Sequence, residues 1–170
     1  CLNDGDTHNS PCEQIEAKFP ILFERHALRQ DSGGAGRWRG GLGLDKVVIA
    51  RAPMNLNIRI ERTQCPPWGL AGGHAGAANR VSLRRDGVWH DDLPNGKVYG
   101  HRMRAGDGFG VHAGGGGGWG VPQLREPQRV ADDVRQGYVS VERARDTYAV
   151  ALRADGSVDA ETTARLRASL

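Results

Sequence analysis

The chain lacks the features that mark membrane and secreted proteins. Its 170 residues include no run near the roughly 20 apolar residues that a membrane-spanning helix needs, and we expect no signal peptide. Its three cysteines, Cys1, Cys12 and Cys65, form no CxxC pair and leave an odd thiol under any disulfide scheme. A reducing compartment suits such a chain, so we expect a cytoplasmic protein with no membrane partner.

The chain also lacks a continuous surface of one charge sign and a phosphate-binding loop. Its formal net charge is +3, but aspartates interrupt the basic residues between positions 84 and 107. A nucleic-acid backbone needs an uninterrupted basic surface, so we expect no nucleic-acid partner. No GxxxxGK[ST] motif occurs, and residues 115–120 match GxGxxG only because polyglycine fits almost any glycine spacing. We interpret this polyglycine as a close-packed turn.

Glycine, in contrast, is abundant. The 25 glycines are about twice the usual share, which favours a loop-rich β architecture. In DSGGAGRWRGGLG, residues 31–43, Arg37, Trp38 and Arg39 stand among six glycines. A flexible linker carries no aromatic or guanidinium groups, so this stretch is either an ordered contact surface or a structural crossing loop. We predict that these three residues are interface or orienting groups, since each arginine could pair bidentately with a carboxylate or phosphate.

The order of local patterns predicts an α+β fold, a mainly antiparallel β domain with a short amino-terminal helix and carboxy-terminal helices. Ser10 as N-cap and Glu13 in a capping box would open the first helix, which should end near Lys18. Alternation and β-branched content predict strands at 21–29, 44–51, 54–61, 97–103 and 108–112, a hairpin turning at 86–87, and a final strand at 151–153. Further helices should start at Pro127, after Ser140 and after Asp159. We predict a β-rich domain over 1–120 and a helical extension packed on it over 121–170.

A metal site is the one chemical interpretation that combines the cysteines with the histidines, and it carries little support. A four-ligand metal set could be drawn from His8, Cys12, Cys65 and His74. Pro11 would start the helix after His8, and Cys65 lies beside prolines, so we expect no metal site in this chain. Three further histidines fall in predicted strands, where packing roles are common, and receive no chemical role: His26, His101 and His112.

The first residue, Cys1, has two interpretations. It could be an N-terminal nucleophile whose own α-amino group acts as base. Alternatively, the chain is the carboxy-terminal part of a larger subunit. We favour the second interpretation because no pattern locates the base and oxyanion donors that a catalytic cysteine needs.

Four sequence segments carry a resemblance to a known family. They are DSGGAGRWRGGLG, CPPWGLAGGHAG, GGGGGWGVP and RVADDVRQGYVSVERARDTYAV. In this order they resemble successive signatures of the hydantoinase B and 5-oxoprolinase family, and the helix opening at residues 9–13 is also similar to that family's pattern. The resemblance covers nearly the whole chain from about Asn9 onward.

This resemblance implies a chain like the carboxy-terminal part of the B subunit of an ATP-dependent N-methylhydantoinase. It implies a component of an ATP-dependent cyclic amide hydrolase that opens a hydantoin, 5-oxoproline or lactam ring. The expected partners are the remainder of the B subunit, an A-type ATP-binding subunit and a small-molecule substrate. ATP and a divalent metal are expected for the complex and not for this fragment alone. The alternative is a subunit of an ATP-dependent ketone carboxylase of the acetone or acetophenone type.

The amino-terminal polar segment supplies the candidate substrate-binding residues, Asp6, His8 and Asn9. They offer a carboxylate, an imidazole and an amide just before a helix, although they could instead do no more than cap and solvate a chain end. Family members often carry histidines just ahead of the Asn-rich segment, whereas this chain has Cys1-Leu2-Asn3-Asp4 there. The substrate is therefore left open.

A less favoured alternative is a nucleic-acid-binding module in which residues 37–41 stack on single strands.

Overall fold

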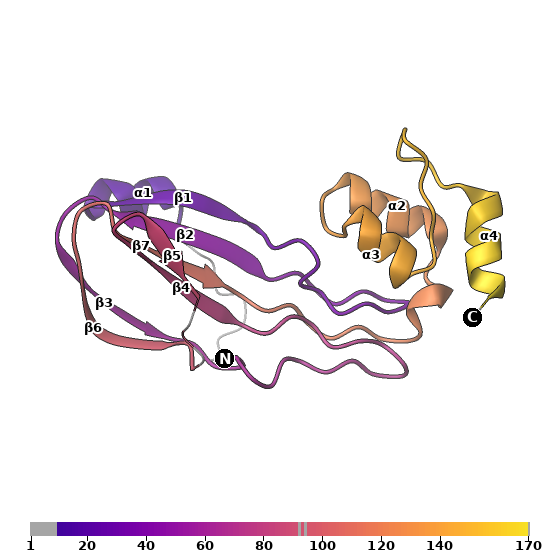
Figure 1. The fold of residues 1–170 in the computed structure, drawn as a ribbon, viewed down its shortest axis with the longest axis horizontal. Helices are drawn as coiled ribbons and strands as arrows, with labels where there is room; N and C mark the ends of the chain where they lie inside the picture. The colour runs from indigo at the N-terminus through magenta and orange to yellow at the C-terminus, as the bar shows by residue number, and fades with distance from the viewer. Residues whose placement is uncertain (1–9, 92, 94, 170) are drawn as a thin grey trace.

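The computed structural model describes residues 10–91, 93 and 95–169, and it has a β-rich end and a helical end (Figure 1). The β-rich end holds helix α1 (Cys12–Lys18) and strands β1 (Ile21–Leu28), β2 (Leu44–Ala50), β3 (Met54–Arg59), β4 (Arg80–Arg85), β5 (Val88–His90), β6 (Lys97–Met103) and β7 (Gly108–His112). The helical end holds a 3-10 turn η1 (Pro122–Leu124) and helices α2 (Pro127–Arg135), α3 (Val141–Asp146) and α4 (Ala160–Ala168). The predicted α+β class is confirmed, while the division into domains 1–120 and 121–170 stays a prediction.

Two antiparallel sheets form the β-rich end. The larger has strand order β1-β2-β7-β4-β5 and the smaller pairs β3 with β6. Alternate residues of β3 are buried, as its period-two pattern predicts. The buried side chains of both sheets form one core, which consists of Ala50, Leu56, Ile58, Val81, Leu83, Val98 and Met103. Burying each large aliphatic side chain contributes about 1.5–3 kcal/mol, so this core holds the sheets face to face.

Most local predictions in the β-rich end are confirmed. The hairpin pairs Arg84 with Trp89, and its turn residues Asp86 and Gly87 both have positive φ angles, 49° and 81°. Asp-Gly is favoured there because a tight hairpin turn requires two left-handed residues. The strands β6 and β7 are consecutive but belong to different sheets. The turn between them therefore carries the chain from one layer to the other.

Capping residues define the helices of the other end. Pro127 opens α2, and Gly137, with φ 74°, follows its end. The Ser140 side chain accepts a hydrogen bond from Arg143 N, and that of Asp159 accepts one from Thr162 N. These predictions are confirmed. A second core packs these helices against Ala35 of the glycine-rich stretch and comprises Val130, Val139, Ala144, Tyr148 and Val150.

Two local predictions are wrong. The first helix has Pro11 as its N-cap, with no side-chain cap hydrogen bond, so Ser10 lies one residue too early to close a capping box with Glu13. Its predicted end at Lys18 is confirmed. The final strand at 151–153 reduces to a single bridge between Leu152 and Val158, because the turn at 154–156 and the start of α4 at Ala160 bound the pairing on both sides. Across the described residues, no helix is both long and apolar enough to cross a membrane.

Tyr148 makes the stability of the helical end sensitive to alkaline pH. Its side chain is fully buried, and its hydroxyl has no hydrogen-bond partner among the described residues. Burial raises the pKa of this phenol above its ordinary value of 10.0, although the Arg125 and Arg143 charges oppose the shift. The unfolded chain therefore loses this proton at a lower pH than the folded chain. The contribution of this phenol to the free energy of unfolding is fully present below the pKa that it has in the unfolded chain. It is lost as the pH rises through the higher pKa that it has in the folded chain.

We expect Tyr148→Phe to reduce the fall in the free energy of unfolding at alkaline pH. Near neutral pH the variant should match the wild type to within about 1 kcal/mol, because the deleted hydroxyl makes no hydrogen bond to any residue that the structure describes. Above the ordinary phenol pKa of 10.0 the variant should become the more stable protein. Urea unfolding at neutral and alkaline pH measures both effects, and parallel pH profiles for the two proteins would contradict the prediction.

Candidate functional site

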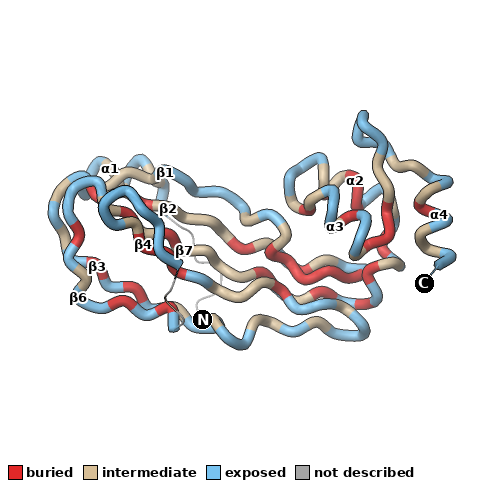
Figure 2. Tube along the Cα trace, viewed as in Figure 1, coloured by how far each residue is buried: buried red, intermediate tan, exposed pale blue. Residues whose placement is uncertain are grey.

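Extended glycine-rich segments connect the two ends of the molecule. Residues 32–43, 68–76 and 113–120 run side by side, outside any named strand, and residues 32–36 are all buried (Figures 1 and 2). Trp38 and Trp119 exchange two backbone hydrogen bonds of 2.9 Å, and Gly118 N donates to His74 O at 2.9 Å. The stretch that contains Arg37, Trp38 and Arg39 is therefore an ordered part of the fold that also crosses between its ends.

The spacing of these segments explains the high glycine content. A Cβ added at Gly40 would lie 2.6 Å from Gly116 C, and one at Gly117 would lie 2.6 Å from Trp68 C, closer than real Cβ atoms approach such atoms. The predicted close-packed turn at residues 115–120 is wrong in shape, since the chain is extended over 115–119 and bends only at Gly120, where φ is 74°. Close packing, however, is what the glycines permit.

The polyglycine does not offer a phosphate cradle. Gly116 N donates to Gly41 O, and Gly118 N donates to His74 O, so these amides are already engaged. A phosphate site needs several amide N–H groups that point at one free position. The residues of this segment therefore do not fit the ATP expected for the complex.

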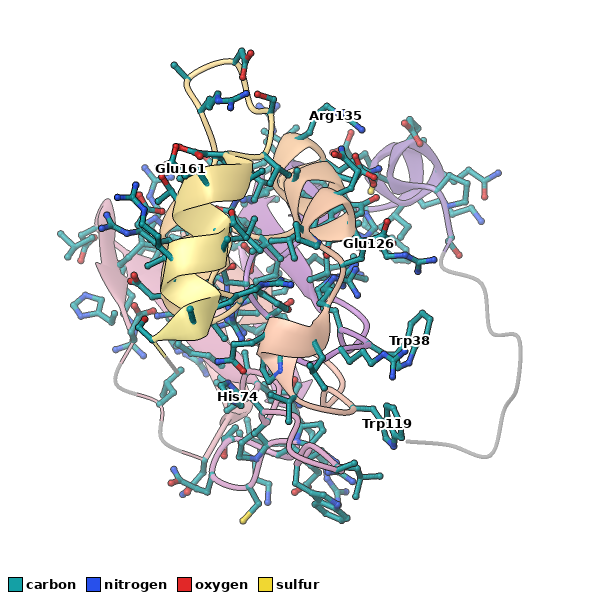
Figure 3. The ribbon with its side chains drawn as sticks, turned by 90° about the vertical axis from the view of Figure 1, so that its right-hand side faces the viewer. Trp38, His74, Trp119, Glu126, Arg135 and Glu161 are labelled. Carbon is teal, nitrogen blue, oxygen red and sulfur yellow. The ribbon has the colours of Figure 1, made fainter. Side chains whose placement is uncertain are left out.

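Trp38 and Trp119 form a partly exposed aromatic pair. Their side chains project from the same side of the molecule (Figure 3), and about half of each residue is exposed. The Arg129 guanidinium lies over the Trp38 ring at 5.3 Å. Arg37 is exposed beside them, and a pocket of about 180 Å³ is lined by Arg37, Trp38, Leu124, Glu126 and Arg129. This surface could receive a partner.

Arg39 differs from Arg37 and Trp38, because its guanidinium binds another residue of this chain. Its Nε lies 3.1 Å from Asp133 Oδ2 and its Nη2 lies 3.2 Å from Oδ1. Arg125 Nη2 also donates to Asp133 Oδ2, at 2.9 Å, and the three side chains are 9–16% exposed. The bidentate geometry considered from sequence is thus present, and it joins the glycine-rich stretch to helix α2.

A second cluster lies on the outer face of the larger sheet. Val81 and Leu83 of β4 face the core, so Ser82 between them lies on the opposite face of the sheet, where it is 3% exposed. His112 of β7 and Asp45 of β2 are cross-strand partners on the same face. His112 Nε2 lies 3.1 Å from Ser82 Oγ, and His112 Nδ1 lies 2.8 Å from Asp45 Oδ1.

This cluster borders a pocket of about 680 Å³. The pocket is lined by Glu24, Arg25, Val47, Arg80, Ser82, Trp89, Asp91 and His112. Gly110 of β7 pairs with both β2 and β4, and it leaves space for the contact between Ser82 and His112. A Cβ at this position would overlap Ser82 Oγ and lie 2.8 Å from His112 Nε2. Sequence reasoning assigned no role to His112, since nothing in the sequence reveals which strands are neighbours.

The remaining candidates give no site. Asp6, His8 and Asn9 lie outside the described residues. Cys12 Sγ lies 2.9 Å from His26 Nδ1, and Cys12 and Cys65 are both free thiols. Within the part of the chain that the structure describes, no group of three or more His, Cys, Asp or Glu side chains could hold a metal ion.

Comparisons with known proteins agree with this architecture. The chain is 30% identical over 165 residues to a Pseudomonas sp. protein provisionally named as the B subunit of a D-/L-hydantoinase, with 96% of this chain and 28% of that protein covered. The nucleotide-free structure of acetone carboxylase superposes with a TM-score of 0.79 at 25% identity, covering 94% of this chain and 26% of that one. ATP-dependent caprolactamase from Pseudomonas jessenii gives 0.75 at 30% identity, covering 93% and 28%.

The chain spans less than a third of the length of each of these relatives. The model of the family described as hydantoinase B/oxoprolinase matches residues 1–122. Three of the four segments that suggested this family from sequence build the connection between the two ends of the fold, and the fourth, residues 129–150, forms most of α2 and all of α3. The chain belongs to the hydantoinase B/oxoprolinase family.

Proposed function

We propose that this chain is part of the B-type subunit of an ATP-dependent cyclic amide hydrolase that opens a hydantoin, 5-oxoproline or lactam ring. The observation that carries the proposal is the family match over residues 1–122, supported by the likeness to ATP-dependent caprolactamase. An unstrained ring amide resists attack because its resonance is lost at the tetrahedral stage, so coupling to ATP cleavage suits this chemistry. The proposed location is the cytoplasm.

The proposed partners are the remainder of the B subunit and an A-type subunit that binds ATP. Alternate polyglycine amides, those of Gly114, Gly116 and Gly118, donate hydrogen bonds within the chain, so we assign the nucleotide, with its divalent metal, to the complex. Arg37 and Trp38 are the candidate contacts, because both are exposed at the edge of a rigid, hydrogen-bonded segment. Arg39 supports this role indirectly, since its pairing with Asp133 fixes the backbone beside them.

A ketone carboxylase subunit is the second candidate, and a specific observation favours it. Acetone carboxylase is the neighbour with the higher TM-score of the two compared, 0.79 against 0.75. A nucleic-acid-binding module is less well supported, because Asp133 already neutralises one of the two guanidinium groups on which it would depend.

We expect phosphate release to be stimulated by a cyclic amide when the intact protein is assayed with its A-type subunit and ATP. The panel is hydantoin, 5-oxoproline, other lactams, and acetone or acetophenone with bicarbonate. The ring-opened product, identified by mass spectrometry, should form in proportion to the phosphate released. Omission of the A-type subunit should abolish both signals, because the proposed ATP site lies there.

The product distinguishes the two candidates. A carboxylated ketone would replace the hydrolase proposal with the carboxylase alternative. The absence of substrate-stimulated phosphate release over the whole panel would contradict both.

A further inference from the structure

The hydrogen bonds among Asp45, His112 and Ser82 have the connectivity of a nucleophile relay. The Asp45 carboxylate can only accept, so the 2.8 Å contact places the His112 proton on Nδ1. In the neutral imidazole, the Nε2 lone pair then faces the Ser82 hydroxyl, 3.1 Å away, which donates to it. A carboxylate that fixes the tautomer of a histidine, and a histidine that accepts a serine proton, are the parts of a Ser-His-Asp triad.

The positions of the three residues keep this arrangement rigid. They come from the adjacent strands β2, β7 and β4, whose backbones are fixed by ladder hydrogen bonds. The side chains of His112 and Asp45 are 14% and 15% exposed, so water competes little for their hydrogen bond. Functional groups on strands hold their geometry better than groups on loops.

The pocket beside the relay has room and charge for a small acyl compound. Its volume is about 680 Å³, within the usual range of ligand pockets. Trp89 and Val47 provide apolar walls, and the charged part of the lining consists of Arg25 and Arg80 together with Glu24 and Asp91. Arg80 pairs with Asp91 at 3.2 Å, and both side chains are about half exposed, so this pair contributes little and can exchange for a ligand carboxylate. The Arg25 side chain is 57% exposed and lies 3.7 Å from Asp45, so it can also turn to a ligand.

We propose that Ser82, activated by His112 and Asp45, is a nucleophile for acyl transfer from small esters or amides that carry a carboxylate, with Arg25 and Arg80 orienting that carboxylate. This proposal does not rest on the ATP-dependent activity. It concerns only groups within this chain.

The reaction needs no other reagent than water. Ser82 Oγ forms a bond to the acyl carbon while its proton passes to His112 Nε2. The bond from the acyl carbon to the leaving oxygen or nitrogen then breaks, and the leaving atom takes the proton from Nε2. Water next attacks the acyl-serine, gives a proton to Nε2, and the acyl–Oγ bond breaks as that proton returns to Oγ. The net change is hydrolysis of the ester or amide.

A fluorophosphonate probe tests the nucleophile directly. We expect the intact protein to be labelled on Ser82, as located by peptide mapping. His112→Gln should slow labelling by about 100-fold or more, since a positioned general base contributes at least that much. The control His101→Gln changes a histidine of the smaller sheet and should label at the wild-type rate. Absence of label on Ser82, while a known serine hydrolase in the same tube reacts, would overturn the proposal.

Alkylation of a cysteine placed at position 82 provides a second measurement, which does not require the pocket to accept the fluorophosphonate probe. Ser82→Cys should react with iodoacetate faster than with iodoacetamide, because iodoacetate carries the carboxylate that the arginines orient. Adding Arg80→Gln should reduce this preference, and adding His112→Gln should slow both reactions. If folded Ser82→Cys protein were alkylated at the same rate with and without His112→Gln, the contact between positions 82 and 112 would be structural only. This result would also overturn the proposal.

Discussion

Replacing Gly117 with alanine is expected to destabilise the fold severely. The added Cβ would lie 2.6 Å from the carbonyl carbon of Trp68 and closer still to its oxygen. Overpacking usually costs about 1–3 kcal/mol when neighbouring side chains can move, but here the obstacle is backbone in a hydrogen-bonded layer. We therefore expect a loss above about 3 kcal/mol in the free energy of unfolding. For a chain of this size that lowers Tm by about 6 °C or more, which thermal unfolding followed by circular dichroism will measure.

The neighbouring residue provides a matched control. A Cβ at Gly116 would have its nearest neighbour, Gly41 N, at 3.4 Å, which is close to ordinary contact. Gly116→Ala should therefore be nearly neutral, or stabilise by up to about 1 kcal/mol because alanine restricts the unfolded chain. Equal losses for the two adjacent variants would show that the segments are not packed as described.

The contrast between these two glycines shows what the sequence could predict. Local signals such as the Asp86-Gly87 turn, the alternation in β3 and the Ser140 and Asp159 caps act within a few residues, so they were predicted correctly. The sequence also indicated that glycine served geometry rather than flexibility. It could not show that residues 113–118 lie against 32–41, because polyglycine carries no side-chain pattern that selects a partner segment.

The candidate sites depended on contacts between distant residues. Arg39 and Asp133 are 94 residues apart, and His112 and Asp45 are 67 apart. A one-residue change of strand register would turn His112 to the core face and remove the relay. The sequence identified Arg39 as a group able to bind a carboxylate in bidentate fashion, but only the fold shows that the carboxylate is Asp133.

Asp133→Asn is expected to cause the other large effect, by leaving two buried arginines without a counter-charge. The side chains of Arg39 and Arg125 are 16% and 9% exposed, and both donate to the Asp133 carboxylate. Removing one partner of a buried ion pair costs about 3–5 kcal/mol, because the remaining charge stays desolvated. Helix α2 should separate more readily from the glycine-rich stretch. Urea unfolding and limited proteolysis will measure the loss of stability and the earlier release of the carboxy-terminal helices.

The adjacent aspartate separates this effect from a general change on helix α2. Asp132 pairs with Arg135 at the surface, where the two side chains are 38% and 71% exposed, so Asp132→Asn should cost less than about 1 kcal/mol. Adding Arg39→Gln to Asp133→Asn should recover part of the loss, since it removes one of the unpaired cations. If the double variant were as unstable as the sum of the two single variants, the ion cluster would not be what joins the two ends of the fold.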